Sequence, residues 1–229
     1  MSYRSISGAG AKAPARRYRS TLRRQQAEQT RLDVVTAAAA LFAEHGYAGT
    51  TLAKIAAAAG VSVETVQSHG PKAALMIAAV EYAAFGETGD RDILDSEIGE
   101  QLSQIEDPEA ALDYLVALQT ELHSRSAHPA RALFGGAAVD PTLDRYLDEL
   151  LTGIKRQMRR VLVLFRERGW LREDLPFDDL VETAALLADV QTYLKIVDRS
   201  RWSDQAYRTW LRRMLAETVM DRGAVRSLR

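Results

Sequence analysis

Residues 50–75 read TTLAKIAAAAGVSVETVQSHGPKAAL, and this stretch is the most informative about the structure of the N-terminal part of the chain. It contains two short helical patterns that are joined at Gly60. Thr51 is a suitable N-cap for the first helix, and Gly60 suits the left-handed backbone conformation that commonly ends a helix. Ser62 is a suitable N-cap for the second helix. The stretch therefore predicts two helices that meet across a tight turn.

The outer face of the second helix carries the side chains that do not pack in the core. Because Val66 is expected to face back toward Ile55, the outward residues are Val63, Glu64, Thr65, Gln67 and Ser68. A helix-turn-helix of this kind places its second helix in the DNA major groove, so we expect these five side chains to read the bases. Gln67 could bind an adenine edge or a phosphate. Glu64 could accept from a cytosine amino group or pair with an arginine.

Charge is divided unevenly along the chain. Residues 1–72 contain 10 of the 30 Lys and Arg but only 4 of the 31 Asp and Glu, which leaves an acidic remainder. A basic segment favours a polyanionic partner, although a solubilising tail is the alternative. Because Arg16, Arg17, Arg19, Arg23 and Arg24 lead into the helix-turn-helix, DNA is the better interpretation. The side chains predicted to contact phosphates are Thr51, Lys54, Ser62, His69 and Lys72. The alternative for His69 is a histidine whose hydrogen bonds are satisfied within the turn. The alternative for Lys54 is a side chain that is only solvated.

The segment from about Arg31 to Leu75 resembles the N-terminal domain of TetR-family transcriptional regulators. The positions of the family motif are filled here by Thr51, Ile55, Ala56, Ala59 to Ser62, Thr65, Gln67, His69 and Lys72. Two positions depart from it: Gln67 stands where the family has Tyr, and Gly70 where it has Phe. The resemblance implies a DNA-binding domain followed by a helical domain that binds a small molecule and forms a homodimer, with His69 and Lys72 on DNA phosphates.

The remaining pattern is helical, without strand alternation, so the predicted class is all-α. We expect a disordered basic arm over residues 1–20, a helix-turn-helix domain over 21–75 and a ligand-binding and dimerisation domain over 76–229. Predicted helices run from Thr21 to Glu44 with Gly46 as the stop, from Pro71 to Phe85, from Asp107 until Pro129 ends it, from Asp140 to Gly169, from Asp178 to Asp198, and onward from Ser203. The polar stretch 86–92 is predicted to follow the Pro71–Phe85 helix.

The resemblance places the dimer surface on Asp140–Arg168 and Asp178–Asp198. An exposed apolar stripe on a long helix needs a partner, although packing within one subunit is the alternative. Polar residues within apolar stripes are markers of a ligand pocket, and these are Gln119, His123, Asp189, Gln191 and Tyr193. Phe165 and Trp170 complete the predicted set of ligand-contacting residues. A core histidine at position 123 and a Trp170 that only seals the core are the alternatives.

Composition excludes several other functions. The chain has no cysteine, so disulfides, thiolate zinc sites and cysteine nucleophiles are excluded, and a cytoplasmic location is compatible. Its four histidines stand at no metal-ligand spacing, no catalytic set is visible, and we expect neither an enzyme nor a cofactor. The predicted function is a ligand-responsive repressor that binds a palindromic DNA operator as a homodimer and is released by a small molecule. A regulator without a small-molecule ligand, or an all-helical enzyme or carrier, is the alternative.

Overall fold

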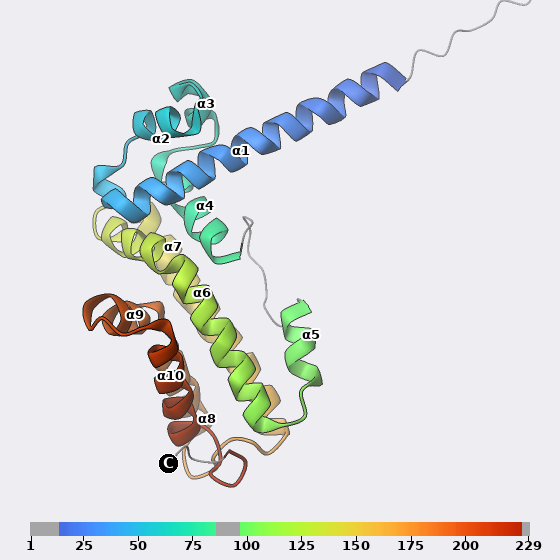
Figure 1. Cartoon of the computed structure of the whole chain (residues 1–229), viewed down its shortest axis with the longest axis vertical. Coiled ribbons are helices and arrows are strands. Elements are labelled where there is room, and N and C mark those ends of the chain that lie inside the picture. Colours follow the sequence, from blue (N-terminus) through green and yellow to red (C-terminus); the bar gives the residue numbers. More distant parts are fainter. Residues whose placement is uncertain (1–13, 86–96, 226–229) are drawn as a thin grey trace, which may run out of the picture.

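The computed structural model describes residues 14–85 and 97–225, and within these ranges it is built from helices (Figure 1). The elements are α1 (Pro14–Gly49), α2 (Leu52–Ala59), α3 (Val63–Ser68), α4 (Lys72–Phe85), α5 (Glu97–Gln104), α6 (Pro108–Ala137), α7 (Pro141–Glu167), α8 (Phe177–Leu187), α9 (Val190–Tyr193), the π-helical segment η2 (Leu194–Arg199) and α10 (Asp204–Thr218). An isolated antiparallel bridge joins Leu171 to Met220. The predicted all-α class is confirmed.

The N-terminal elements pack around α1. This helix contacts α2, α4 and α6, and Figure 1 shows its N-terminal part extending beyond the rest of the molecule. It begins at Pro14, so the end of the predicted disordered arm lies in α1, whereas residues 1–13 lie outside the described residues. Gly46 has φ 70° and ψ 177°, and this conformation interrupts the helix where the sequence predicts a stop.

One hydrophobic cluster holds the helix-turn-helix against the rest of the protein. It combines Phe42 of α1, Ile55 of α2 and Val66 of α3, which are fully buried, with Leu133 of α6 and Leu143 of α7. The ends of α6 and α7 therefore belong to the same core as the helix-turn-helix. The predicted domain boundary at residue 75 falls inside α4.

The second cluster forms the helical body. The long helices α6 and α7 lie against each other, with α8 and α10 on one side and α5 on the other (Figure 1). Phe165 of α7, Leu180 of α8 and the pair Tyr207 and Leu211 of α10 are almost completely buried in it. The predicted polar stretch 86–92 lies outside the described residues.

Helix α6 continues past Pro129, so the prediction that this proline ends the helix is wrong. Proline within a helix removes one backbone hydrogen bond and crowds the preceding turn. Here Pro129 itself is buried, as are Ala130, Ala132 and Leu133 just after it. The apolar area that these residues bury as a helix offsets the local cost, because each buried side chain of this kind stabilises the fold by about 1 kcal/mol or more.

The single helix predicted from Asp178 to Asp198 is also wrong. Helix α8 ends at Leu187, and Asp189 has extended backbone angles and caps α9 by accepting from Gln191 N at 2.6 Å. Ala188 O, at the break, accepts a hydrogen bond of 2.9 Å from Gln119 Nε2 on α6. A side chain distant in sequence therefore satisfies a carbonyl that the broken helix leaves free.

The apolar stripe of α7 packs mainly inside the subunit. Leu143, Met158, Val161 and Phe165 are buried, while Ile154 is 42% exposed. Most of this stripe is therefore covered within the subunit, as in the alternative interpretation, while Ile154 remains exposed. On α8, Leu186 is 62% exposed and is the more prominent apolar side chain.

Candidate DNA-binding surface and ligand cavity

The turn between α2 and α3 is fixed by the predicted caps. Thr51 Oγ1 accepts a hydrogen bond from Lys54 N at 3.2 Å, and Ser62 Oγ accepts from Thr65 N at 3.1 Å. Gly60 lies in the left-handed region with φ 67° and donates its N–H to Ala56 O. The local chemistry of these three residues sets the direction in which α3 leaves the turn.

Thr50, which was not predicted from the sequence, holds this unit to α1. It is fully buried, and its Oγ1 lies 2.9 Å from Gly46 O and 3.1 Å from Leu41 O. Its partners are up to nine residues away, so only the folded end of α1 brings them together.

The outer face of α3 carries the predicted base-reading residues. Glu64, Gln67 and Ser68 are exposed, whereas Val63 and Thr65 are half-buried. Ser68 Oγ donates to Thr65 O at 2.7 Å, and Thr65 Oγ1 is 3.1 Å from Ser62 Oγ. The hydroxyl groups of Thr65 and Ser68 are thus hydrogen-bonded within the helix and its cap. Gln67 stands out as the long polar side chain that is available on the exposed face.

Glu64 interacts with the start of its own helix. Its backbone N–H and the Ser62 hydroxyl both hydrogen-bond to the carboxylate, and they lower the pKa of Glu64 below its usual value. A carboxylate is stabilised at this position because the free N–H groups of a helix N-terminus are partially positive. The Glu64 carboxylate therefore interacts favourably with the N-terminus of α3, and its two DNA-directed roles stay predictions.

The predicted phosphate-contacting residues lie around the same surface. Thr51, Lys54 and Ser62 are exposed, and Lys54 Nζ donates to Gly49 O at 2.7 Å. His69 is half-buried at the C-terminus of α3. Lys72 Nζ lies 4.1 Å from the centroid of the Tyr47 ring, and partial burial lowers the pKa of this lysine.

Tyr47 joins the DNA-binding half to the body, and sequence reasoning missed it. Its hydroxyl donates to Asp140 Oδ2 at 2.6 Å, across 93 residues of sequence. Burial, followed by this hydrogen bond, raises the pKa of Tyr47, and the same bond lowers the pKa of Asp140. Since Asp140 also caps α7 through Thr142 N, the end of α1, the start of α4 and the start of α7 meet at one point.

Gly70 and Pro71 form the connection to α4. Gly70 has φ 119°, and a Cβ atom there would lie 3.1 Å from Ala74 Cβ, so the larger aromatic residue of the family motif would not fit this backbone. Helix α4 begins at Lys72, and Pro71 O accepts from Leu75 N at 3.2 Å. Pro71 therefore takes the cap position, and α4 begins one residue after the predicted start at Pro71.

A cavity of about 350 Å³ lies among α4, α6, α7 and the break between α8 and α9. Gln119, His123 and Asp189 from the predicted ligand set line it. Phe165, Trp170 and Tyr193 do not line it. Phe165 and Trp170 pack edge to face with ring centroids 5.3 Å apart, and the Tyr193 hydroxyl donates to Asp204 Oδ1 at 2.6 Å. These three aromatic side chains pack in the hydrophobic core that supports the cavity.

Two side chains form a polar site on the α6 wall of this cavity. Gln119 Nε2 is 2.9 Å from Ala188 O and 2.9 Å from His123 Nε2. His123 is 4% exposed, and burial lowers its pKa to about 4. The imidazole is consequently neutral near pH 7 and can accept a hydrogen bond through Nε2.

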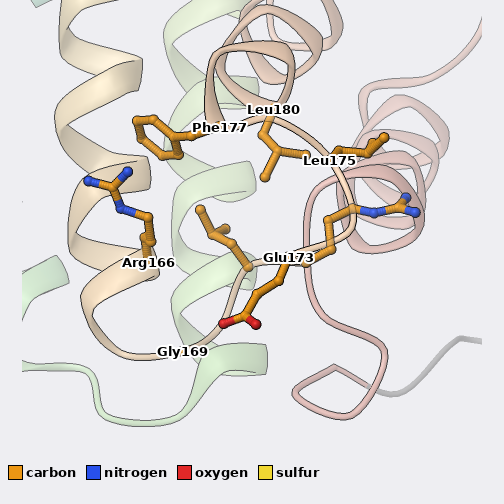
Figure 2. A pocket seen from close by; sticks show the side chains of 8 residues that line it. Arg166, Gly169, Glu173, Leu175, Phe177 and Leu180 are labelled. Atoms are coloured by element: carbon orange, nitrogen blue, oxygen red, sulfur yellow. The ribbon is translucent and has the colours of Figure 1, made fainter.

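A smaller hollow of about 140 Å³ lies between the end of α7 and the start of α8 (Figure 2). Figure 2 shows Arg166 and Phe177 on one side of it and Leu175 and Leu180 on the other, with Glu173 below. The Arg166 guanidinium lies 4.1 Å from the centroid of the Phe177 ring. This cation–π contact joins the end of α7 to the start of α8, the two helices predicted to form the dimer surface.

Comparison with known proteins agrees with this architecture. Residues 34–78 match the family model described as bacterial regulatory proteins, tetR family. No curated protein matches the chain. Among solved structures, the SmeT–triclosan complex has a TM-score of 0.66 at 21% identity, covering 86% of this chain and 94% of that one.

Two further solved structures have the same fold. A transcriptional regulator from Saccharomonospora viridis in complex with choline has a TM-score of 0.65 at 19% identity and covers 85% of this chain and 99% of its own. A protein described as a TetR-family regulator from Mesorhizobium loti has a TM-score of 0.62 at 20% identity, over 84% and 96% of the two chains.

The matched segment contains α2, α3 and the residues that position them. Residues 34–78 thus match a tetR-family DNA-binding domain, and the described helices share the fold of the regulators compared. In the described ranges, no helix is both long and apolar enough to cross a membrane. The same ranges contain no group of three metal-ligating side chains.

Proposed function

We propose that the protein is a homodimeric repressor that binds a palindromic DNA operator through α3 and is released when a small molecule enters the α4–α6–α7 cavity. The observation that carries this proposal is a capped α3 with an exposed polar face in the same molecule as a 350 Å³ cavity. Pockets of this size suit small organic molecules. Two similar structures hold such molecules, triclosan and choline, which supports a ligand over control by a protein partner.

On the DNA side, two copies of α3 would enter successive major grooves about 34–36 Å apart. Glu64, Gln67 and Ser68 are exposed, and Lys54 and Lys72 precede and follow them in the sequence. The exposed apolar side chains Ile154 and Leu186 lie on the two helices that we assign to the dimer surface. Phosphate neutralisation would supply much of the affinity, so binding would weaken steeply with added salt.

Helix α4 provides the connection between the cavity and the DNA-binding surface. Val80, Glu81 and Ala84 of α4 line the cavity, whereas Lys72 at the start of the helix follows α3 directly. A ligand that favours one position of α4 over another would change the spacing of the two α3 helices. A ligand with equal affinity for both positions would leave DNA binding unchanged.

Two measurements on the purified chain test this proposal. Fluorescence anisotropy with random duplex DNA at low salt should show binding that is lost as salt is raised. A thermal-shift screen should find compounds that raise the melting temperature, because a ligand of the folded state stabilises it. DNA binding without any stabilising compound would favour the regulator that lacks a small-molecule ligand, and catalytic turnover without DNA binding would favour the enzyme alternative.

A further inference from the structure

The polar site formed by Gln119 and His123 specifies the chemistry of the cavity's ligand. We infer that the cavity takes an uncharged, largely apolar molecule whose hydroxyl group, or other neutral donor, donates a hydrogen bond to Gln119 Oε1. This inference rests on the proposed function, because it names the class of molecule that would release the protein from DNA.

The orientation of the Gln119 amide is fixed by its two partners. Ala188 O is a backbone carbonyl and can only accept, so the amide nitrogen must face it at 2.9 Å. The second N–H of the same nitrogen points to His123 Nε2, also at 2.9 Å. Reversing the amide would bring two oxygens together at Ala188. Both N–H groups are therefore used, and Oε1 has a defined direction.

Both N–H groups of the Gln119 amide are used, and its oxygen Oε1 is the acceptor that remains available to a ligand. Among the described residues no group donates to it, and it is not sealed by protein as His123 Nδ1 is. Since Gln119 lines the cavity, this oxygen can be reached from inside. His123 is a positioning residue: its neutral ring accepts from Gln119 and keeps the amide from rotating. Its own Nδ1 is enclosed and takes no part in binding.

The surroundings of Gln119 favour an apolar and uncharged occupant. Leu115, Leu118 and Leu122 of α6, with Met158 and Val161 of α7, line the same cavity. An anion here would meet the Gln119 oxygen and the nearby Asp189 carboxylate. A cation beside Gln119 would lose its hydration among leucines, and Asp189 is already engaged as the cap of α9. The charged lining residues Glu81, Glu149 and Arg156 belong to α4 and α7, not to the α6 wall that carries Gln119. A molecule with an apolar body and one neutral hydrogen-bond donor can pair with Gln119 Oε1 and places no charge among the apolar side chains.

A matched pair of probes tests this specificity on the full-length protein. The probes are 2-naphthol, which has a hydroxyl donor, and 2-methoxynaphthalene, which has the same ring system but can only accept. Equilibrium dialysis should show about tenfold tighter binding of 2-naphthol, the size expected for one hydrogen bond to a group left unpaired by the other probe. Positively charged 2-naphthylmethylamine and negatively charged 2-naphthoate should both bind more weakly than 2-naphthol.

Three substitutions identify the residues responsible. Gln119→Met, which keeps the length of the side chain, should remove the preference between the two neutral probes while the apolar probe still binds. His123→Leu should reduce the preference because the amide is freed to rotate, an effect that a purely structural role would not produce. Gln191→Met makes the same chemical change on an exposed residue outside the cavity and should retain the tenfold ratio.

The inference is overturned if the wild-type protein binds both neutral probes equally or binds neither, if a charged probe binds tightest, or if Gln119→Met keeps the preference. DNA affinity measured for each variant without probe separates this outcome from the proposed function. Normal DNA binding with no probe preference would refute only the ligand class. Absence of DNA binding would refute the proposed function, whatever the probes do.

Discussion

Adding one methyl group at Gly136 should destabilise the junction between the DNA-binding half and the body. A Cβ atom at this position would lie 2.6 Å from Leu143 Cδ1 and 3.0 Å from Tyr47 Cγ. Carbon atoms pack at about 3.5–4.0 Å, so Leu143 or the Tyr47 ring would have to move by about 1 Å. Leu143 is completely buried, and Tyr47 is held by its bond to Asp140. Overpacking of this kind costs about 1–3 kcal/mol.

The neighbouring glycine provides the control for this substitution. Gly135 lies in the same turn of α6, and a Cβ atom there has no atom within 4 Å. Gly135→Ala should therefore stabilise the helix by up to about 1 kcal/mol, since alanine favours helices over glycine by that amount. For a chain of this length, each kcal/mol shifts the melting temperature by about 2–4 °C. Thermal unfolding followed by circular dichroism at fixed protein concentration should move in opposite directions for Gly136→Ala and Gly135→Ala. Equal shifts of the same sign would refute the described packing of α6 on Tyr47 and Leu143.

Three other substitutions have defined expected results. Gln67→Ala should weaken binding to the preferred operator by about 1–3 kcal/mol and leave nonspecific binding unchanged, and equal weakening on all sequences in a DNA titration would make Gln67 a phosphate contact instead. Thr50→Val should lower the free energy of unfolding by about 1–3 kcal/mol in urea titrations, because buried hydrogen bonds to the end of α1 are lost, and an unchanged midpoint would contradict that role. Burial lowers the pKa of His123 from 6.5 in the unfolded chain to about 4 in the folded protein. As the pH falls from 6.5 to 4, the unfolded chain therefore takes up a proton on His123 that the folded protein does not. This difference in proton binding lowers the free energy of unfolding by up to about 3 kcal/mol. His123→Leu should show a shallower loss over that interval, and identical pH dependence in the two proteins would argue against a neutral, buried His123.

Local chemistry made the helix-turn-helix predictable from the sequence. The caps at Thr51, Gly60 and Ser62 each depend on residues within a few positions, and all three are present in the structure. The starts of α6 and α10 follow the same rule through Asp107 and Ser203. Capping residues and the spacing of apolar residues are sufficient to predict where a helix starts and ends when the residues involved are near neighbours in the sequence.

Contacts between distant residues explain what the sequence did not predict. Helix α6 passes through Pro129 because the residues around it are buried by other helices. The break at Ala188 is accompanied by a bond from Gln119, 69 residues earlier, and Tyr47 meets Asp140 across 93 residues. Polarity within an apolar stripe correctly suggested Gln119 as lining the cavity, but the same rule could not distinguish Tyr193, whose hydroxyl is satisfied inside the core.

We propose that two α3 helices, presented by a symmetric pair of subunits, read a palindromic DNA sequence. Selection of bound fragments from random duplex DNA by the purified full-length protein tests it most directly. We expect enrichment of an inverted repeat whose half-site centres are about one helical turn apart or a multiple of it. Recovery of no enriched sequence at low salt, or of a single half-site bound by a monomer, would contradict it.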